Sequence, residues 1–149
     1  KETVIDAYCG TGTISIYMAA HAGHVIGIEI VPKAIEDAKK NARGNGIINT
    51  EFITGDAGKI MPELYQKGIR PDVILCDPVR AGCSRQVLDA AVSMAPERLV
   101  YVSCNPATMS RDIARLKADG YILQCVQPVD MFPQTMHVEC VCLMSRTGK

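Results

Sequence analysis

Cys104 lies at a position that favours a reactive thiolate. It ends an apolar segment, and the two residues after it, Asn105 and Pro106, are typical of a helix N-cap and a first helical turn. The positive end of that helix dipole would point toward the sulfur and favour the thiolate, the nucleophilic form of cysteine. Four other cysteines lie inside apolar segments, where we expect buried and inert thiols: Cys76, Cys125, Cys140 and Cys142.

Glu139 is the candidate general base. It stands at the head of an apolar run that continues with Cys140, Val141 and Cys142. A carboxylate beside buried positions is costly unless it is paired or protonated, and partial burial makes it a stronger proton acceptor. The alternative is a solvated glutamate at the end of a strand. A nucleophile combined with a base indicates covalent catalysis.

A glycine-containing turn near the start of the chain indicates a ligand site. The segment Asp6–Thr13 reads Asp-Ala-Tyr-Cys-Gly-Thr-Gly-Thr. Gly10 and Gly12 allow the backbone to turn tightly and to approach a ligand before a helix begins at Thr13. Ser15 stands where the dinucleotide-binding fingerprint has its third glycine, which disfavours a nicotinamide cofactor and favours a ligand without a pyrophosphate.

Glu29 and Asp56 add two acidic groups to this turn. Glu29 ends the next apolar segment, about twenty residues later, where a carboxylate accepts both hydroxyls of a ribose. A surface acid is the alternative for Glu29. Asp56 follows a third apolar segment and suits the amino group of adenine, the N-cap of the next helix, or both. A glycine turn, a ribose acid and an adenine acid together predict a site for S-adenosylmethionine.

Strand-like and helix-like segments alternate regularly along the chain, and the candidate site residues lie at their ends. The predicted strands are Thr3–Tyr8, His24–Glu29, Glu51–Thr54, Asp72–Asp77, Arg98–Ser103, Gly120–Val126 and Val138–Met144. The predicted helices are Thr13–Ala22, Pro32–Arg43, Ala57–Gln66, Ser84–Met94 and Pro106–Ala118. This order predicts a doubly wound, Rossmann-like α/β fold with a largely parallel seven-stranded sheet, and its ligand at the carboxyl ends of the strands. The last strand should be antiparallel, because the connection before it suits a hairpin.

Composition limits the class of protein. The 149 residues suit one domain, 1–149, and with 48% hydrophobic and 21% charged residues they exclude disorder. No apolar run approaches the roughly 20 residues that span a bilayer. Seven cysteines without a CxxC pair disfavour a zinc site and indicate a reducing, cytoplasmic compartment. The chain begins at Lys1 and soon enters an apolar segment, so we expect a domain of a longer protein.

The sequence motifs resemble those of a known family of enzymes. The motifs that carry the resemblance are Asp6–Thr13, Glu29, Asp77-Pro78-Val79-Arg80, Ser103-Cys104-Asn105-Pro106 and His137-Val138-Glu139. In this order and spacing they resemble the RNA uracil-5-methyltransferases, which make 5-methyluridine in ribosomal or transfer RNA. The resemblance covers nearly the whole chain. It departs from the family pattern at Val79, where the family has a second proline.

The resemblance assigns roles to individual residues. It implies that Cys104 is the nucleophile and Glu139 the base, and it aligns Tyr8, Glu29 and Asp77 with positions of the cofactor site. Asp77 and Arg80 are candidates to orient the edge of the uracil and a neighbouring phosphate. It further implies a monomer that uses S-adenosylmethionine and RNA, without a metal ion or a membrane. Full-length members carry N-terminal RNA-binding parts, so we expect weak cofactor binding and little activity from this chain alone.

Other interpretations stay open. Amino-group methyltransferases place an aromatic residue at the end of the strand-four motif, where this chain has Arg80. Cytosine-5 methyltransferases are expected to have a second catalytic cysteine in that motif, which is absent here. A catalytically silent domain kept for RNA binding is the non-enzymatic alternative. The presence of Cys104 and Glu139 argues against such decay, and the zero net charge argues against a dedicated RNA binder.

Overall fold

Strands and helices alternate along the chain as the sequence predicts. The computed structural model describes residues 1–148. The strands are β1 (Thr3–Asp6), β2 (His24–Glu29), β3 (Thr50–Thr54), β4 (Val73–Cys76), β5 (Arg98–Ser103), β6 (Tyr121–Val129) and β7 (Glu139–Arg146). The helices are α1 (Thr13–Ala19), α2 (Pro32–Gly44), α3 (Ala57–Gln66), α4 (Arg85–Met94) and α5 (Pro106–Ala118). Within residues 1–148, none of these helices is long and apolar enough to cross a membrane.

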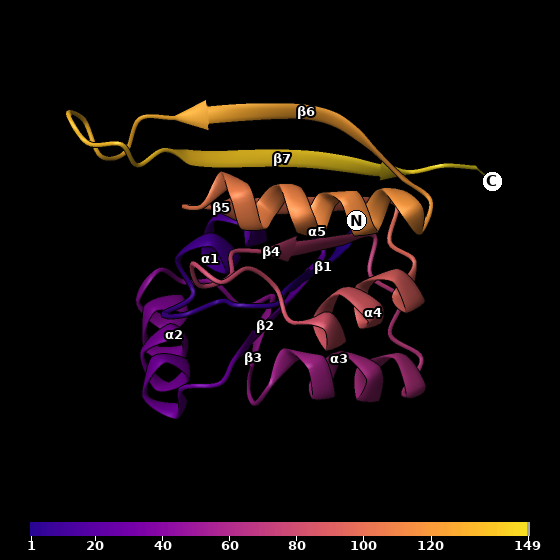
Figure 1. Cartoon of the computed structure of the whole chain (residues 1–149). Coiled ribbons are helices and arrows are strands. Elements are labelled where there is room, and N and C mark those ends of the chain that lie inside the picture. Colours follow the sequence, from indigo (N-terminus) through magenta and orange to yellow (C-terminus); the bar gives the residue numbers. More distant parts are fainter. Residues whose placement is uncertain (149) are drawn as a thin grey trace.

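All seven strands form one sheet in the order β3-β2-β1-β4-β5-β7-β6. Pairing is parallel from β3 through β5, whereas β7 runs antiparallel to both β5 and β6. β7 therefore inserts between β5 and β6, and the hairpin that joins the last two strands projects beyond the other elements (Figure 1). The predicted doubly wound fold with an antiparallel last strand is confirmed.

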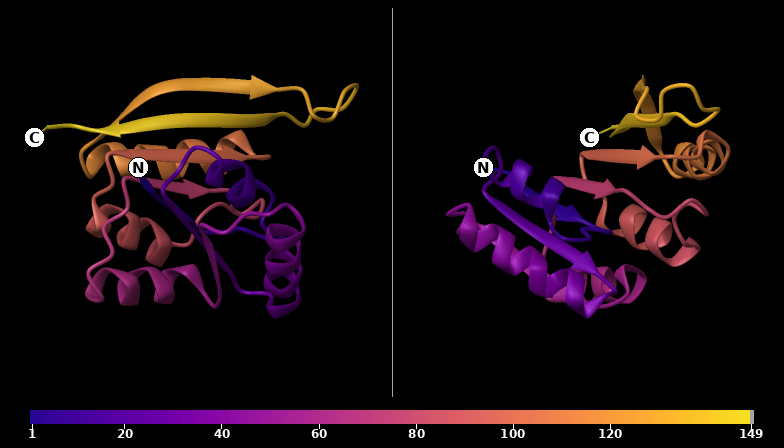
Figure 2. Two further views of the ribbon diagram at one scale, coloured as in Figure 1. Left: turned by 180° about the vertical axis from the view of Figure 1, so that it is seen from behind. Right: turned by 90° about the vertical axis from the view of Figure 1, so that its left-hand side faces the viewer.

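The helices cover both faces of the sheet, as a doubly wound fold requires (Figure 2). Neighbouring residues of β1 point to opposite faces. Ile5 packs in the main core with residues of α3, α4 and α5, whereas Val4 packs with Ala19 of α1. Phe52 of β3 packs against Ile35 of α2 in a third cluster. Because both faces are covered, β4 is buried along its whole length.

Most predicted boundaries are within two residues of those in the structure, and three differences are larger or change a conclusion. Helix α1 ends at Ala19 rather than Ala22. Strand β6 extends to Val129, because it pairs with β7 as far as Glu139. Cys125 is exposed, so the prediction that it is buried was wrong. β6 is the outermost strand and its residues beyond Tyr121 have few neighbours, so an apolar sequence did not lead to burial there.

The buried centre of the sheet should dominate the stability of the domain. Ile74 of β4 is 0% exposed, so Ile74→Ala should lower the free energy of unfolding by about 2–5 kcal/mol, because it removes buried methyl groups and leaves a cavity. Urea denaturation of the 149-residue chain measures this change. Ile48→Ala is the matched control, since Ile48 is 95% exposed, and it should alter the free energy of unfolding by less than about 0.5 kcal/mol. Equal losses in the two variants would contradict this account of the core.

Candidate active site

The turn after β1 places an open stretch of backbone at the carboxyl edge of the sheet. Gly10 and Gly12 have φ values of +53° and +83°, which are unfavourable for residues with a Cβ. A Cβ at Gly12 would lie 3.0 Å from Cβ of Ala38 and from Cζ of Phe52, so this glycine permits close packing. A Cβ at Gly10 would meet no atom within 4 Å, so the backbone there borders open space. Thr13 is exposed in the first turn of α1.

Glu29 reaches from the end of β2 to the glycine turn. Its Oε2 accepts a hydrogen bond from the backbone N–H of Gly10 at 3.2 Å, and its Oε1 accepts one from the N–H of Val31 at 2.9 Å. Each carboxylate oxygen has a second lone pair, so both can still accept hydrogen bonds from a ligand. Glu29 is therefore fixed beside Gly10 with accepting capacity left over.

Asp56 and Tyr8 have contacts within the protein. Asp56 is the N-cap of α3, and its Oδ1 accepts a hydrogen bond from the N–H of Gly58 at 2.8 Å. This confirms the N-cap role, while the adenine role stays a prediction. Tyr8 is half-buried and its hydroxyl lies beside Cys83 and Ser84, where burial and the neighbouring thiol raise the pKa of its phenol. Tyr8 therefore stays protonated and connects the turn after β1 to the β4–α4 loop.

The antiparallel pairing of β7 with β5 brings Cys104 and Glu139 to the same end of the sheet. Ser103, the last residue of β5, pairs with Cys140 of β7. Cys104 follows Ser103 and Glu139 precedes Cys140, so both residues flank the last paired position of these two strands. Both are partly buried. Asn105 caps α5 by accepting a hydrogen bond from the N–H of Ala107 at 3.2 Å, as predicted.

Asp77 and Arg80 lie in the loop that follows β4, next to this pair. Desolvation by neighbouring protein atoms and the negative charge of Glu139 raise the pKa of the Asp77 carboxyl above its usual value. Nη1 of Arg80 lies 3.5 Å from Nδ1 of His137, two residues before Glu139. Cys104, Glu139, Asp77 and Arg80 therefore lie at one end of the sheet.

Asp6 is a site residue to which sequence reasoning assigned no role. Its side chain is 2% exposed, and Oδ2 accepts a hydrogen bond of 2.7 Å from Oγ of Ser15. Oδ1 is buried and has no hydrogen-bond partner among residues 1–148. Burial raises the pKa of Asp6 to about 6, against the opposing effect of Ser15. An acid that ends an apolar strand directly before a glycine turn is the sequence signal that could have pointed to it.

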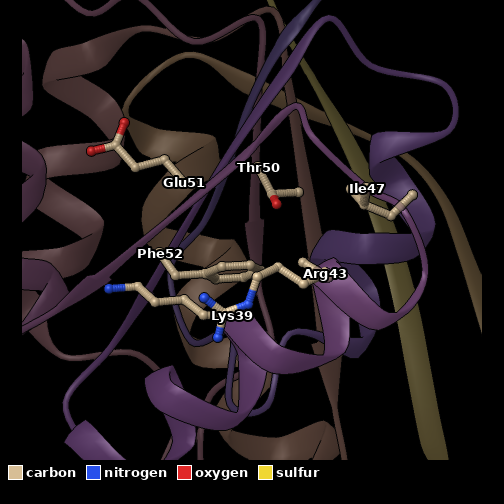
Figure 3. Close-up of a pocket in the computed structure, with 7 residues that line it drawn as sticks. Lys39, Arg43, Ile47, Thr50, Glu51 and Phe52 are labelled. Carbon is tan, nitrogen blue, oxygen red and sulfur yellow. The ribbon is translucent and has the colours of Figure 1, made fainter.

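A separate hollow lies on another part of the molecule. It has a volume of about 450 Å³, lies between α2 and the start of β3, and is lined by Lys39, Arg43, Glu51 and Phe52 among others. Lys39 and Arg43 lie beside the ring of Phe52, and the side chain of Glu51 points away from it (Figure 3). These residues lie toward the amino end of β3, away from the carboxyl ends of the strands. None of the predicted site residues lines this hollow.

Comparison with known proteins agrees with this geometry. A sequence family described as a methyltransferase domain matches residues 1–146. The chain belongs to this methyltransferase family. It is 57% identical over 144 residues to an uncharacterized RNA methyltransferase of Halalkalibacterium halodurans, covering 97% of this chain and 31% of that protein. It is 55% identical over 149 residues to one of Bacillus cereus, covering 100% and 32%. The methyltransferase chain thus spans about a third of the length of these relatives.

Solved structures show the same fold. A tRNA (uracil-54, C5)-methyltransferase of Pyrococcus abyssi, in complex with S-adenosyl-L-homocysteine, matches with a TM-score of 0.83 and 32% identity, over 97% of this chain and 34% of that one. NSun6 of Pyrococcus horikoshii, at 17% identity and a TM-score of 0.82, shares the fold over 100% of this chain and 49% of its own. The chain is a class I methyltransferase domain that depends on S-adenosylmethionine.

The residues present fit this cofactor. S-adenosylmethionine carries a sulfonium and an ammonium group, and the unpartnered buried oxygen of Asp6 suits a positively charged ligand. The open backbone at Gly10 leaves room for close approach, and Glu29 retains accepting capacity for ribose hydroxyls. Asp6, Gly10, Glu29 and Asp56 are the residues that would hold it.

Ionisation of Asp6 should reduce the stability of the domain at neutral pH. Its pKa is about 6 in the folded chain and 3.8 in an ordinary environment, so the folded state holds this proton more tightly. The stabilisation is complete below about pH 4 and is lost as the pH rises through 6. Between pH 5 and 7.5 the free energy of unfolding should fall by about 1 kcal/mol through this group. Urea denaturation of the 149-residue chain at the two pH values measures this fall.

Asp6→Asn should remove this part of the pH dependence, because the amide does not titrate. Asp130→Asn, at an exposed loop position, is the control and should keep the parental dependence. An Asp6→Asn variant with the parental difference between pH 5 and 7.5 would contradict the assignment.

Proposed function

We propose that this domain transfers a methyl group from S-adenosylmethionine to carbon 5 of a uridine in ribosomal or transfer RNA, through a covalent adduct with Cys104. The observation that supports the proposal is the register of β5 and β7, in which the last pair, Ser103 and Cys140, has Cys104 after one member and Glu139 before the other at the same end of the sheet. Relatives named as RNA methyltransferases support RNA as the substrate. The likeness to the P. abyssi tRNA (uracil-54, C5)-methyltransferase supports uracil carbon 5 as the target atom.

The chemistry begins with Cys104. Carbon 5 of uracil is a poor nucleophile, and addition of the Cys104 thiolate to carbon 6 forms an S–C6 bond and moves the ring electrons into an enolate that is nucleophilic at carbon 5. S-adenosylmethionine supplies the electrophilic methyl group when it is bound. Glu139 then takes the proton that remains on carbon 5. The freed electron pair restores the C5–C6 double bond and expels the thiolate of Cys104.

The neighbouring groups would position the base. Nη1 of Arg80 lies beside His137, and the charge of Glu139 acts on Asp77. From these positions the carboxyl of Asp77 would accept a hydrogen bond from the uracil edge and the guanidinium of Arg80 would bind a nearby phosphate. The target uridine has to leave its stack to reach Cys104, as is usual for enzymes that modify bases. Choice of the RNA would rest on the parts of the relatives that this chain does not span. The seven free cysteines favour a reducing, cytoplasmic site of action.

Loss of the nucleophile tests the covalent step. In the full-length protein, Cys104→Ala should abolish methylation of uridine and leave the dissociation constant for S-adenosylmethionine within about twofold, because only Sγ of Cys104 forms the bond to carbon 6. Transfer of a radiolabelled methyl group and calorimetry measure the two effects. Cys125→Ala, an exposed cysteine on β6, is the matched control and should keep parental activity. Turnover in the Cys104→Ala protein would remove the covalent mechanism.

Loss of the base tests the release step. Glu139→Gln should lower turnover by about 10²–10⁴-fold and accumulate a covalent RNA–protein species, because the adduct is released only after the carbon 5 proton leaves. Denaturing gel electrophoresis detects that species by its slow migration. Glu97→Gln, an exposed position just before the opposite end of β5, should give no such species. If the Glu139→Gln protein lacks the adduct while its turnover is impaired, Glu139 is not the base.

A further inference from the structure

The backbone of the β4–α4 loop is fastened to helix α5 at successive residues. The carbonyl oxygen of Arg80 accepts hydrogen bonds from Nδ2 of Asn105 at 3.2 Å and from Oγ1 of Thr108 at 3.1 Å. The carbonyl of Ala81 accepts one from Nη2 of Arg111 at 3.0 Å. Helix α5 follows Cys104 directly, so these contacts connect Arg80 to the element that begins beside the cysteine.

A buried carboxylate completes this connection. Asp112 is 2% exposed, and its Oδ2 accepts hydrogen bonds from the N–H of Cys83 at 2.9 Å and from the hydroxyl of Tyr101 at 2.6 Å. Its Oδ1 accepts one from Nε of Arg111 at 2.9 Å. A buried carboxylate is tolerated when it is paired in this way, and the removal of one partner is costly. Asp112 and Arg111 therefore act as one unit, in which Arg111 neutralises the carboxylate and also holds Ala81.

Gly82 shows how close this contact is. It has a φ of +85°, and a Cβ there would lie 2.6 Å from Oδ2 of Asp112 and 2.7 Å from Nη2 of Arg111. Any side chain at this position would displace the loop from α5. The loop therefore has a glycine between Ala81 and Cys83, the two residues whose backbone atoms hydrogen-bond to the pair.

We propose that Arg111 and Asp112 are positioning residues for the methyl transfer proposed above: by clamping residues 80–83 to α5, they hold Arg80 and Asp77 in a fixed place relative to Cys104. This inference rests on the proposed function. Arg111 does not contact the base; its role is to keep the groups that orient the uracil within reach of the sulfur. Covalent addition depends steeply on such geometry, because a misplacement of about 1 Å can cost about 10²-fold in rate.

The rate of adduct formation tests the clamp. Full-length protein is mixed with S-adenosylmethionine and a saturating RNA that carries 5-fluorouridine, which traps the methylated adduct because carbon 5 bears no proton. Arg111→Ala should slow adduct formation by roughly tenfold or more, while the dissociation constant for S-adenosylmethionine stays within about twofold. Its melting temperature should fall, because the buried Asp112 loses its counter-charge, so the rates are compared well below the melting temperature of the variant. Arg111→Lys should recover part of the rate, because one ammonium reaches Asp112 or Ala81 but not both. Gly82→Ala should slow the same step from the loop side.

Arg115→Ala is the matched control. Arg115 lies one turn further along α5 and pairs with Asp89 of α4, so its removal should leave the rate of adduct formation unchanged. Parental rates in both Arg111→Ala and Gly82→Ala would overturn the positioning role. A rate loss in Arg111→Ala that is matched by an equal loss in Arg115→Ala would also overturn it. If the parental protein forms no adduct at all, it is the proposed covalent function that fails, and the clamp of that reaction fails with it.

Discussion

The antiparallel direction of β7 is the constraint on which the candidate active site depends. In a sheet, parallel strands present their carboxyl ends at one edge, and an antiparallel strand presents its amino end there. Glu139 is the first residue of β7, so it lies at the end of the sheet where β5 finishes and Cys104 follows. With β7 parallel to β5, the glutamate would lie at the opposite edge. Strand direction, rather than nearness in sequence, brings residues 104 and 139 to the same end of the sheet.

Three acidic residues lie at the carboxyl ends of the parallel strands, at the same end of the sheet as Glu139. Asp6, Glu29 and Asp77 follow or end different strands, and the charges of Glu29 and Asp77 contribute to the raised pKa of Asp6. Such an accumulation of carboxylates costs stability in the absence of a counter-charge and favours a positively charged ligand. The sulfonium cofactor of this methyltransferase family has that charge. The parallel strands thus contribute Asp6, Glu29 and Asp77 at their carboxyl ends, and the antiparallel strand β7 contributes Glu139 at its amino end.

Local sequence patterns were sufficient to predict the strands, the helices and the doubly wound fold. Apolar runs of strand length alternate with helical periodicity, so strand number, helix number and the final hairpin followed from them. The exposure of Cys125 did not follow, because an apolar pattern does not reveal that an outermost strand lacks neighbours. The environment of Asp6 and the pairing of Asp112 with the loop at Cys83 depend on residues far apart in sequence. Tertiary packing determines such contacts, and one sequence alone does not show them.

The unpaired outer edge of β6 should affect the solubility of the molecule. Within residues 1–148 no strand pairs with its outer side, its nine residues carry no charge, and Ile122 and Val126 are about half exposed. An exposed edge strand presents unpaired N–H and C=O groups that can pair with another chain, and charged residues on the strand usually prevent this aggregation. Pro128, which lacks an N–H, removes one donor from β6. Solubility at high concentration should therefore be limited at the outer edge of this strand.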